Sequence, residues 1–313
     1  MYSLPPAFIE QMQRQLGAAL PDFLHTYELP YRRGIRMRPG ISPIDDALQS
    51  VPWAENAYYL PLESRAGALP AHEAGAYYLQ EPSAMTAAAV LQPESGDLVL
   101  DLCAAPGGKT TQNALRMAGQ GTIVCNEPIA DRARILSRNV ERMGVSNALV
   151  VSADPEKFSP IWPECFDAIL VDAPCSGEGM IRRDPDALNQ WSVEHTLSCA
   201  TRQLKILESA KKALRKGGIL VYSTCTFSKE ENEGVIEAFL KENPDFELTD
   251  FSESFGREGL IKNTCRIYPM DGGEGHFAAR LRKKGDEKGV FSEQIASNKV
   301  PSLVTDFLKE IFK

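Results

Sequence analysis

The sequence predicts an α/β protein built on a doubly wound, mostly parallel sheet of seven strands. Three observations predict it: five short apolar runs rich in β-branched residues, helical stretches between them, and a hairpin pattern after the last helix. Such runs suit parallel strands that are buried on both faces. Alternating strands and helices indicate right-handed crossovers. The five runs are 98–102, 122–127, 148–152, 167–172 and 218–223.

The helical stretches predict the layers that cover this sheet, and the last two strands complete it. The segment CRIYPMDGGEGHFAARL (265–281) has the pattern of two antiparallel strands around a turn. Pro269 and the run Asp271-Gly272-Gly273 supply the turn chemistry. The helices are expected at about 108–118, 129–143, 198–216 and 229–242.

The chain before residue 80 has a different character. Residues 7–20 can form a short amphipathic helix, whereas 21–79 is rich in proline and aromatic residues and shows little periodicity. We therefore expect an N-terminal region of residues 1–79 and a sheet domain of residues 80–284. The polar segment 285–313 is expected to be a linker or the start of a C-terminal domain.

Composition limits the class of protein. A chain of 313 residues with 43% hydrophobic and 24% charged residues is typical of a globular protein, and a net charge of -8 neither indicates nor excludes nucleic acid. Seven cysteines without a CxxC pair, and four histidines without ligand spacing, argue against zinc, so we expect no metal. We find neither a signal peptide nor an apolar segment near the ~20 residues that span a bilayer. We therefore expect a cytoplasmic protein with reduced thiols and no membrane partner.

The segment DLCAAPGGKT (101–110) closes the first run and opens a helix. Its Gly-Lys-Thr ending is similar to a phosphate-binding loop, but that motif requires a glycine where Cys103 stands. What survives is a tight glycine-rich turn at the carboxyl end of the first strand. Doubly wound folds bind nucleotides at this edge.

Three carboxylates follow successive strands at the same edge. Glu127 ends the second run, Asp154 follows the third, and Asp172 ends the fourth. Acids would repel a pyrophosphate, but they suit a ligand that has a ribose and an adenine without phosphates. S-adenosylmethionine is such a ligand, and its sulfonium is positive. Any one of these acids could be only a helix cap, whereas three beside the glycine turn favour a binding rim.

Two cysteines stand apart from the other five. Cys175 follows the fourth run and Cys225 follows the fifth, so both thiols are expected to face one crevice. Ser228 and Glu231 match a capping box, which predicts a helix start right after Cys225. That helix terminus and nearby Lys109 would both lower the pKa of a thiol. The remaining thiols are expected to be small buried hydrophobic groups: Cys103, Cys125, Cys165, Cys199 and Cys265.

A methyl donor, a thiolate and a carboxyl group together suit methylation of cytosine at carbon 5. That carbon is a weak nucleophile, but a thiolate that adds to carbon 6 converts the ring into an enamine able to attack the sulfonium methyl. An acid near ring nitrogen 3 would stabilise the charge that develops there. Loss of the proton on carbon 5 and expulsion of the thiol would complete the turnover.

Four segments carry a resemblance to a known family. DLCAAPGGKT, NEP, DAPCSGEGM and YSTCTF resemble, in this order, the signatures of the Sun/Fmu-type RNA (cytosine-5) methyltransferases. The likeness is greatest to the bacterial members that modify small-subunit ribosomal RNA, and it covers roughly residues 30–284. It implies a Rossmann-like class I methyltransferase domain, a small N-terminal RNA-binding domain, and methylation of cytosine in RNA, 16S ribosomal RNA above all.

The resemblance also implies roles for individual residues. Cys225 would be the nucleophile that forms a covalent intermediate with cytosine, and Cys175 would help to release the product. Asp172 would contact both the donor and the base, and Lys109 would join these three as a catalytic residue. Contacts to the donor are implied for Cys103, Ala104, Ala105, Pro106, Gly107, Gly108, Lys109, Glu127, Asp154 and Asp172.

Basic and aromatic residues indicate where RNA would bind. The stretch YRRGIRMRPG (31–40) has four arginines and no acid. Together with Tyr27, Tyr31 and Trp53 it is expected to hold phosphates and stack bases, and the resemblance favours this over a solvated charged loop.

Two further sets of arginines are candidates for the same surface. Arg134, Arg138 and Arg142 are spaced by four and line one face of a predicted helix. Arg182 and Arg183 come shortly after Cys175, where RNA would enter the site.

The sequence leaves the RNA open. Ribosomal RNA is the leading substrate, transfer RNA is an alternative, and an RNA-binding assembly factor without turnover is a third reading. Both cysteines and the AAPGG turn are intact, which favours an enzyme. The resembling bacterial proteins continue into a C-terminal RNA-binding domain, whereas this chain stops at Lys313, and this bears on the choice of site rather than on the chemistry. We expect a monomer whose partner is RNA.

Overall fold

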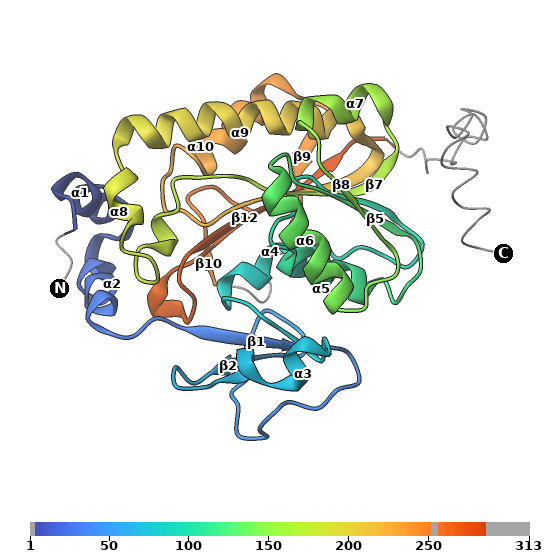
Figure 1. Cartoon of the computed structure of the whole chain (residues 1–313). Coiled ribbons are helices and arrows are strands. Elements are labelled where there is room, and N and C mark those ends of the chain that lie inside the picture. The colour runs from blue at the N-terminus through green and yellow to red at the C-terminus, as the bar shows by residue number, and fades with distance from the viewer. Residues whose placement is uncertain (1–3, 252–255, 286–313) are drawn as a thin grey trace, which may run out of the picture.

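The computed structural model describes residues 4–251 and 256–285. Apart from Gly285, the expected C-terminal linker lies outside the described residues. Figure 1 shows a sheet with helices on both faces and a smaller N-terminal sheet lying beside it.

Five parallel strands form the centre of the large sheet, as the apolar runs predict. Their order in space is β6-β5-β4-β7-β8, and each neighbouring pair is parallel. The order in which the chain adds strands reverses between β4 and β7, which is where doubly wound folds place their ligands. The strands are β4 (Leu98–Asp101), β5 (Thr122–Asn126), β6 (Ala148–Val151), β7 (Phe166–Asp172) and β8 (Leu214–Thr224).

The predicted hairpin extends the sheet beyond β8. β11 (Thr264–Ile267) pairs antiparallel with β12 (His276–Lys283), and β12 pairs antiparallel with β8. The described residues add two short strands to the seven expected, β9 (Phe246–Leu248) beside β12 and β10 (Arg257–Glu258) beside β11.

Helices cover both faces of the sheet. α4 (Thr86–Leu91) and α5 (Gly108–Arg116) pack on one face, with α6 (Ala130–Arg142) beside them. α7 (Phe158–Ile161), α9 (Val193–Ala213) and α10 (Glu233–Glu242) pack on the other face, and the short α8 (Ala187–Gln190) packs with the N-terminal helices.

Both boundaries of the helix expected at 198–216 differ from the expectation. α9 begins at Val193, where the Ser192 hydroxyl accepts a hydrogen bond from the His195 backbone N–H, and it ends at Ala213. The predicted end at residue 216 is wrong because the chain already enters β8 at Leu214, where burial in the sheet outweighs helical propensity.

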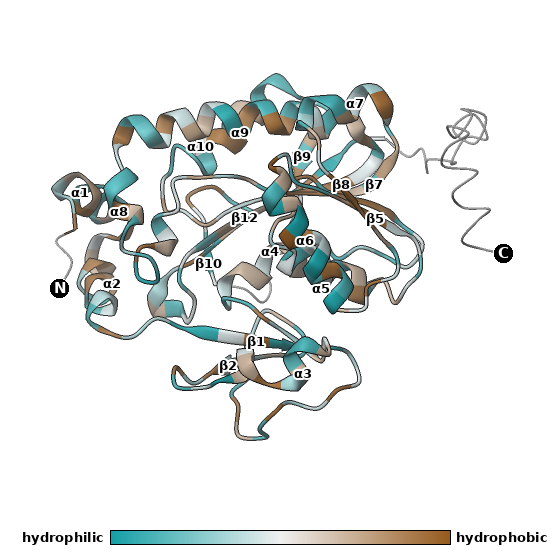
Figure 2. Ribbon diagram, viewed as in Figure 1, coloured by the Kyte–Doolittle hydropathy of each residue, from teal (hydrophilic) through white to brown (hydrophobic). Residues whose placement is uncertain are grey.

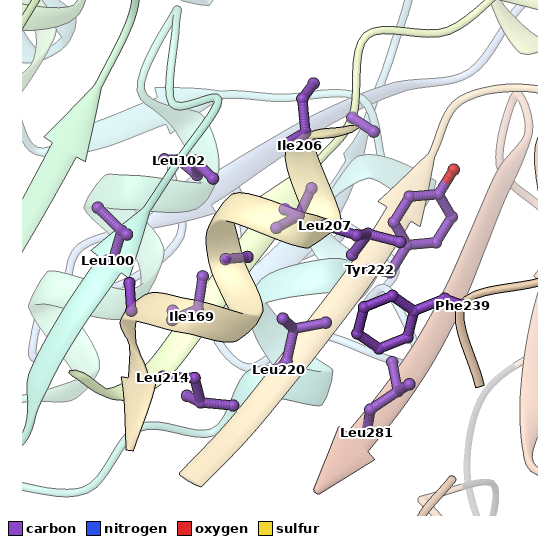
Figure 3. Close-up of a cluster of buried hydrophobic side chains, with 14 of the residues drawn as sticks. Leu100, Leu102, Ile169, Ile206, Leu207, Leu214, Leu220, Tyr222, Phe239 and Leu281 are labelled. Atoms are coloured by element: carbon purple, nitrogen blue, oxygen red, sulfur yellow. The ribbon is translucent and has the colours of Figure 1, made fainter. Parts of the chain in front are cut away.

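The main core lies between the sheet and α9. Figure 3 shows Leu100, Ile169 and Leu220 of the strands facing Ile206 and Leu207 of α9. Figure 2 shows hydrophobic colour along the central strands, whereas α9 alternates between hydrophobic and hydrophilic residues. The strands are therefore covered on both faces, as their continuous apolar runs require.

The N-terminal region contains a sheet that the sequence did not reveal. β2 (Ala57–Leu60), β1 (Arg33–Met37) and β3 (Tyr77–Leu79) form three antiparallel strands in that order, with α3 (Pro70–Glu73) before β3. The helix expected at 7–20 is divided into α1 (Pro6–Leu16) and, after one 3-10 turn, α2 (Leu20–His25), because Gly17 has a positive φ of 52°.

Buried polar contacts join the N-terminal sheet to the sheet domain. Arg36 of β1 donates hydrogen bonds to the Gly108 carbonyl (3.1 Å) and the Thr111 hydroxyl (2.8 Å) at the start of α5. Arg142 of α6 donates to the carbonyls of His72 (2.7 Å) and Tyr77 (3.3 Å). The N-terminal sheet therefore packs directly against the helix that follows the glycine turn.

Candidate active site

Two cavities meet at the carboxyl edge of the parallel strands. The first has a volume of about 520 Å³ and contains the three acids that follow β5, β6 and β7. The second, of about 380 Å³, lies between the glycine turn, β3 and the hairpin. Four residues line both cavities: Cys103, Ala105, Asp172 and Cys225. A ligand in either cavity would therefore approach the same two thiols and the same carboxylate.

The first cavity brings the predicted rim together. Glu127 is buried and accepts a hydrogen bond from the Ile129 N–H (2.9 Å), with Arg132 3.2 Å from its second oxygen. Asp154 lines the same cavity and also accepts from the Glu156 N–H (3.0 Å), so it caps a short helical turn as well. Carboxylates held in this way are fixed acceptors for hydroxyl groups.

The glycine turn forms the wall between the cavities. Gly107 has a φ of 108°, and a Cβ at this position would also lie 3.0 Å from Leu136, so glycine is required here. The Ala105–Pro106 peptide bond is cis. Cys103 lines both cavities, so its assignment as a fully buried hydrophobic group is wrong, and Cys165 is likewise only partly buried. Both lie at strand or loop ends, where the core does not enclose them.

Asp172 is anchored by two donors. Its Oδ2 accepts a hydrogen bond from Lys109 Nζ (2.7 Å), and its Oδ1 accepts from the Ser223 hydroxyl (2.7 Å) on the neighbouring strand. Burial raises the pKa of Asp172, but the Lys109 ammonium and the nearby His276 ring outweigh it and hold that pKa well below the usual range. Asp172 is therefore an anion at the junction of the two cavities.

The two thiols lie in contact. Cys175 Sγ and Cys225 Sγ are 3.3 Å apart, which confirms that the ends of β7 and β8 bring them to one crevice. The hydrogen bond to Cys225 and burial raise the pKa of Cys175 well above the usual range. Two thiolates at this distance would repel each other. The pair can carry one negative charge much more readily than two.

The predicted helix start right after Cys225 is wrong. α10 begins only at Glu233, and residues 229–232 form turns. The Ser228 hydroxyl accepts from the Glu231 N–H (3.3 Å), but the Glu231 carboxylate turns away and accepts from the Ser176 N–H (2.9 Å) and Gln203 Nε2 (2.9 Å). The capping box fails because this carboxylate is engaged by the loop that carries Cys175.

Two buried acids that the sequence did not assign to the site, Glu178 and Glu231, fix the thiol loops. Glu178 accepts hydrogen bonds from the Phe227 N–H (2.9 Å), Trp191 Nε1 (2.7 Å) and Gln11 Nε2 (3.0 Å). It therefore connects the Cys175 loop to the Cys225 loop and to α1, while Glu231 makes a second connection between the loops. Their positions three residues after Cys175 and six after Cys225 were the only signal, and acids near cysteines are common.

His276, the first residue of β12, also lines the second cavity. Its Nε2 lies 3.6 Å from Asp172 Oδ1. No spacing pattern in the sequence indicated this residue, because the hairpin brings it to the site from about 100 residues beyond Asp172.

The predicted RNA-binding residues are placed unequally. Arg36 is buried in its contacts with α5, and burial lowers its pKa to about 10. Trp53 is buried and donates to the Pro82 carbonyl (2.7 Å), so it cannot stack on a base. Arg142 packs over the Tyr78 ring and bonds to the N-terminal sheet, so the three arginines of α6 do not form one exposed face. Tyr31 lies at the surface.

Arg182 and Arg183 differ although they are adjacent. The Arg182 side chain is only 6% exposed, and its Nη1 donates to both carboxylate oxygens of Glu274 (2.9 and 3.0 Å), so its expected role in meeting RNA is wrong. Arg183 is exposed and lines the second cavity. Glu274, a buried carboxylate, holds Arg182 in an ion pair, whereas Arg183 faces solvent beside the second cavity.

Replacing Arg182 by methionine is expected to destabilise the fold, because it leaves Glu274 buried without its cation. The free energy of unfolding at pH 8 should fall by about 3 kcal/mol. Burial raises the pKa of Glu274 to about 7, so at pH 6 the carboxyl can take up a proton and the loss should be smaller. Denaturant unfolding at both pH values measures this, with Arg183→Met as the matched control. Equal losses in both variants would contradict the assignment.

Among residues 4–251 and 256–285, no helix combines the length and the apolar character that crossing a bilayer requires.

Known proteins match both parts of the chain. The family model for 16S rRNA methyltransferase RsmB/F matches residues 88–282, and the model for the N-terminal domain of 16S rRNA methyltransferase RsmF matches residues 4–82. The ribosomal RNA small subunit methyltransferase F proteins of Erwinia tasmaniensis and Citrobacter koseri are 39% and 40% identical over 303 and 306 residues. Each match covers 89% of this chain and 63% of the relative, so the chain spans less than two thirds of these relatives.

Solved structures share the fold. A methyltransferase homolog from Pyrococcus horikoshii has a TM-score of 0.76 and 29% identity, covering 90% of this chain and 100% of that one. NSun6 from Pyrococcus horikoshii, crystallised with SFG, has a TM-score of 0.66 and 35% identity, covering 74% and 58%. The resemblance inferred from the four sequence segments is thereby confirmed. The larger family model matches more than half of the residues of this chain, and the chain therefore belongs to the RsmB/F family of 16S rRNA methyltransferases.

Proposed function

We propose that this chain methylates carbon 5 of cytosine in RNA, most of all in 16S ribosomal RNA, with S-adenosylmethionine as the donor. The observation that carries the proposal is the junction of the two cavities, where Cys225 and Asp172 line both. One cavity would hold the donor and the other the target base, so that the reacting groups meet at these two side chains. The names of the curated relatives support ribosomal RNA as the substrate.

The first cavity fits the donor. Glu127 would accept hydrogen bonds from the ribose hydroxyls, and Asp154 would accept a hydrogen bond from the adenosine part of the bound donor. The glycine turn from Cys103 to Lys109 would hold the donor through its backbone. When bound, the donor supplies an electrophilic methyl group on a sulfonium. Asp172, an anion at the inner end, is compatible with that positive charge.

In the second cavity Cys225 would act as the nucleophile. Its thiolate sulfur bonds to carbon 6, and the electron pair of the 5,6 double bond shifts so that carbon 5 becomes nucleophilic and negative charge collects at ring nitrogen 3. After methylation of carbon 5, loss of its proton restores the double bond as the carbon–sulfur bond breaks and the electron pair returns to sulfur. Cys175, in contact with Cys225, would supply the proton exchange that this release requires.

Asp172 and Lys109 would hold the base. The Asp172 carboxylate can accept a hydrogen bond from the 4-amino group of cytosine, and Lys109 keeps it charged and in place. Arg183 beside the second cavity would contact the backbone of the entering RNA, together with the exposed residues of 31–40.

Bisulfite sequencing of ribosomal and transfer RNA tests the proposal. RNA from cells that lack this protein should lose 5-methylcytosine at a defined position, and expression of the chain, but not of Cys225→Ala, should restore it. Loss confined to transfer RNA would assign that substrate instead. An unchanged methylation pattern in both RNA classes would contradict an enzymatic function.

A further inference from the structure

His276 is a buried side chain without a hydrogen-bond partner. Only 2% of its side chain is exposed, and neither Nδ1 nor Nε2 makes a hydrogen bond within the described part of the chain. An imidazole always carries at least one N–H donor. Burying such a group without a partner costs about 1–3 kcal/mol. This cost calls for an explanation at the wall of a cavity.

The neighbouring groups do not satisfy this imidazole. Asp172 Oδ1 lies 3.6 Å from Nε2, which is beyond hydrogen-bond distance, and it accepts from the Ser223 hydroxyl at 2.7 Å. Asp172 Oδ2 accepts from Lys109. A molecule in the cavity that His276 lines can supply the partner that the imidazole lacks.

The backbone around His276 is closely constrained. Gly275 has a φ of 147°, and a Cβ there would lie 2.6 Å from the Phe227 ring and 2.9 Å from Gly179. His276 itself is paired with Ile267 in the hairpin. The backbone that carries the imidazole is thus held against the loops that follow β7 and β8, which is the arrangement needed for a preorganised contact to a ligand.

We propose that His276 recognises the target base by donating a ring N–H to nitrogen 3 of cytosine, while Asp172 accepts from the 4-amino group. This inference rests on the proposed function and deepens it. As an anion paired with Lys109 and Ser223, Asp172 has no proton to donate to nitrogen 3, yet that atom gains charge when the Cys225 sulfur bonds to carbon 6. His276 supplies the missing donor.

The same pair of contacts would discriminate against uracil. Uracil presents an N–H at position 3 and a carbonyl oxygen at position 4, so it offers a donor to the His276 donor and an acceptor to the Asp172 carboxylate. Unpaired or opposed polar groups in a buried site penalise such an analogue strongly. His276 and Asp172 together would therefore read the cytosine edge.

The test measures bond formation at carbon 6 without the donor. Ribosomal RNA transcribed with 5-azacytidine should trap wild-type protein in an adduct that survives a denaturing gel. His276→Phe should slow adduct formation about 100-fold, as does loss of one preorganised donor elsewhere. His276→Gln, which keeps an N–H donor, should recover most of the rate. Binding of S-adenosylmethionine, measured by calorimetry, should stay within 2-fold in all variants.

His195→Gln is the control, because His195 lines neither cavity. Melting temperatures identify any variant that fails to fold. If His276→Phe does not fold, the rate of adduct formation by His276→Gln alone tests the proposal. Equal loss in the Phe and Gln variants, or a normal rate in His276→Phe, would overturn the role of His276 and leave the proposed function standing. Absence of any adduct with the wild-type protein would instead contradict the proposed function, and with it the role of His276.

Discussion

Cys225→Ala is expected to abolish methyl transfer, lowering kcat by about 10⁴-fold or more. The side chain lines both cavities, and its removal takes away the atom that would bond to carbon 6. Asp172, Lys109 and the glycine turn keep their contacts, so the dissociation constant of S-adenosylmethionine should change less than 3-fold. Transfer of a tritiated methyl group to ribosomal RNA measures the first quantity, and calorimetry measures the second.

Cys165→Ala is the matched control for this experiment. Its thiol is also partly exposed but lines neither cavity, so its activity should equal that of the wild type. Normal turnover by Cys225→Ala would remove Cys225 as the nucleophile and would return the assignment to Cys175.

Cys175→Ala is expected to accumulate a covalent enzyme–RNA adduct. The Cys175 thiol is 3.3 Å from Cys225 Sγ, close enough to exchange a proton with the group that must leave carbon 6. Loss of a positioned acid or base costs about 10²–10⁴-fold in rate. Attack by Cys225 does not need Cys175, so the intermediate should form and then fail to resolve.

A denaturing gel of the variant incubated with donor and RNA should show a slowly migrating band that nuclease treatment removes. The double variant Cys175→Ala/Cys225→Ala should show no band, which separates a covalent adduct from tight binding. A band in Cys225→Ala and none in Cys175→Ala would reverse the two roles.

The sheet domain could be predicted because its central strands β4, β5 and β7 are buried on both faces. A strand such as β7 is then a continuous apolar run, and the polar residue that ends it, Asp172, is predicted to lie at the edge of the sheet. The N-terminal sheet gave no such signal. Its strands have only three to five residues and are separated by proline-rich loops.

The site could be predicted only as far as strand ends determine it. Cys175 and Cys225 follow neighbouring strands, so their meeting follows from sheet order. Glu178, Glu231 and His276 reach the site through loops and through the hairpin, and no local pattern encodes those contacts. Arg182 shows the opposite error, because a basic residue near a motif is not thereby exposed, and a buried carboxylate determines its position.

The guanidinium of Arg36 is enclosed between β1 and the first turn of α5. This contact fixes the position of the N-terminal sheet relative to the cavities that contain Cys225. An outward movement of the N-terminal sheet would break the hydrogen bonds of this cation. We therefore expect the N-terminal sheet and the sheet domain to move as one rigid body. An RNA bound to the N-terminal sheet would then lie at a fixed distance from the Cys225 sulfur. The target cytosine would therefore be selected by its distance from the RNA segment bound to the N-terminal sheet, as well as by the identity of the base.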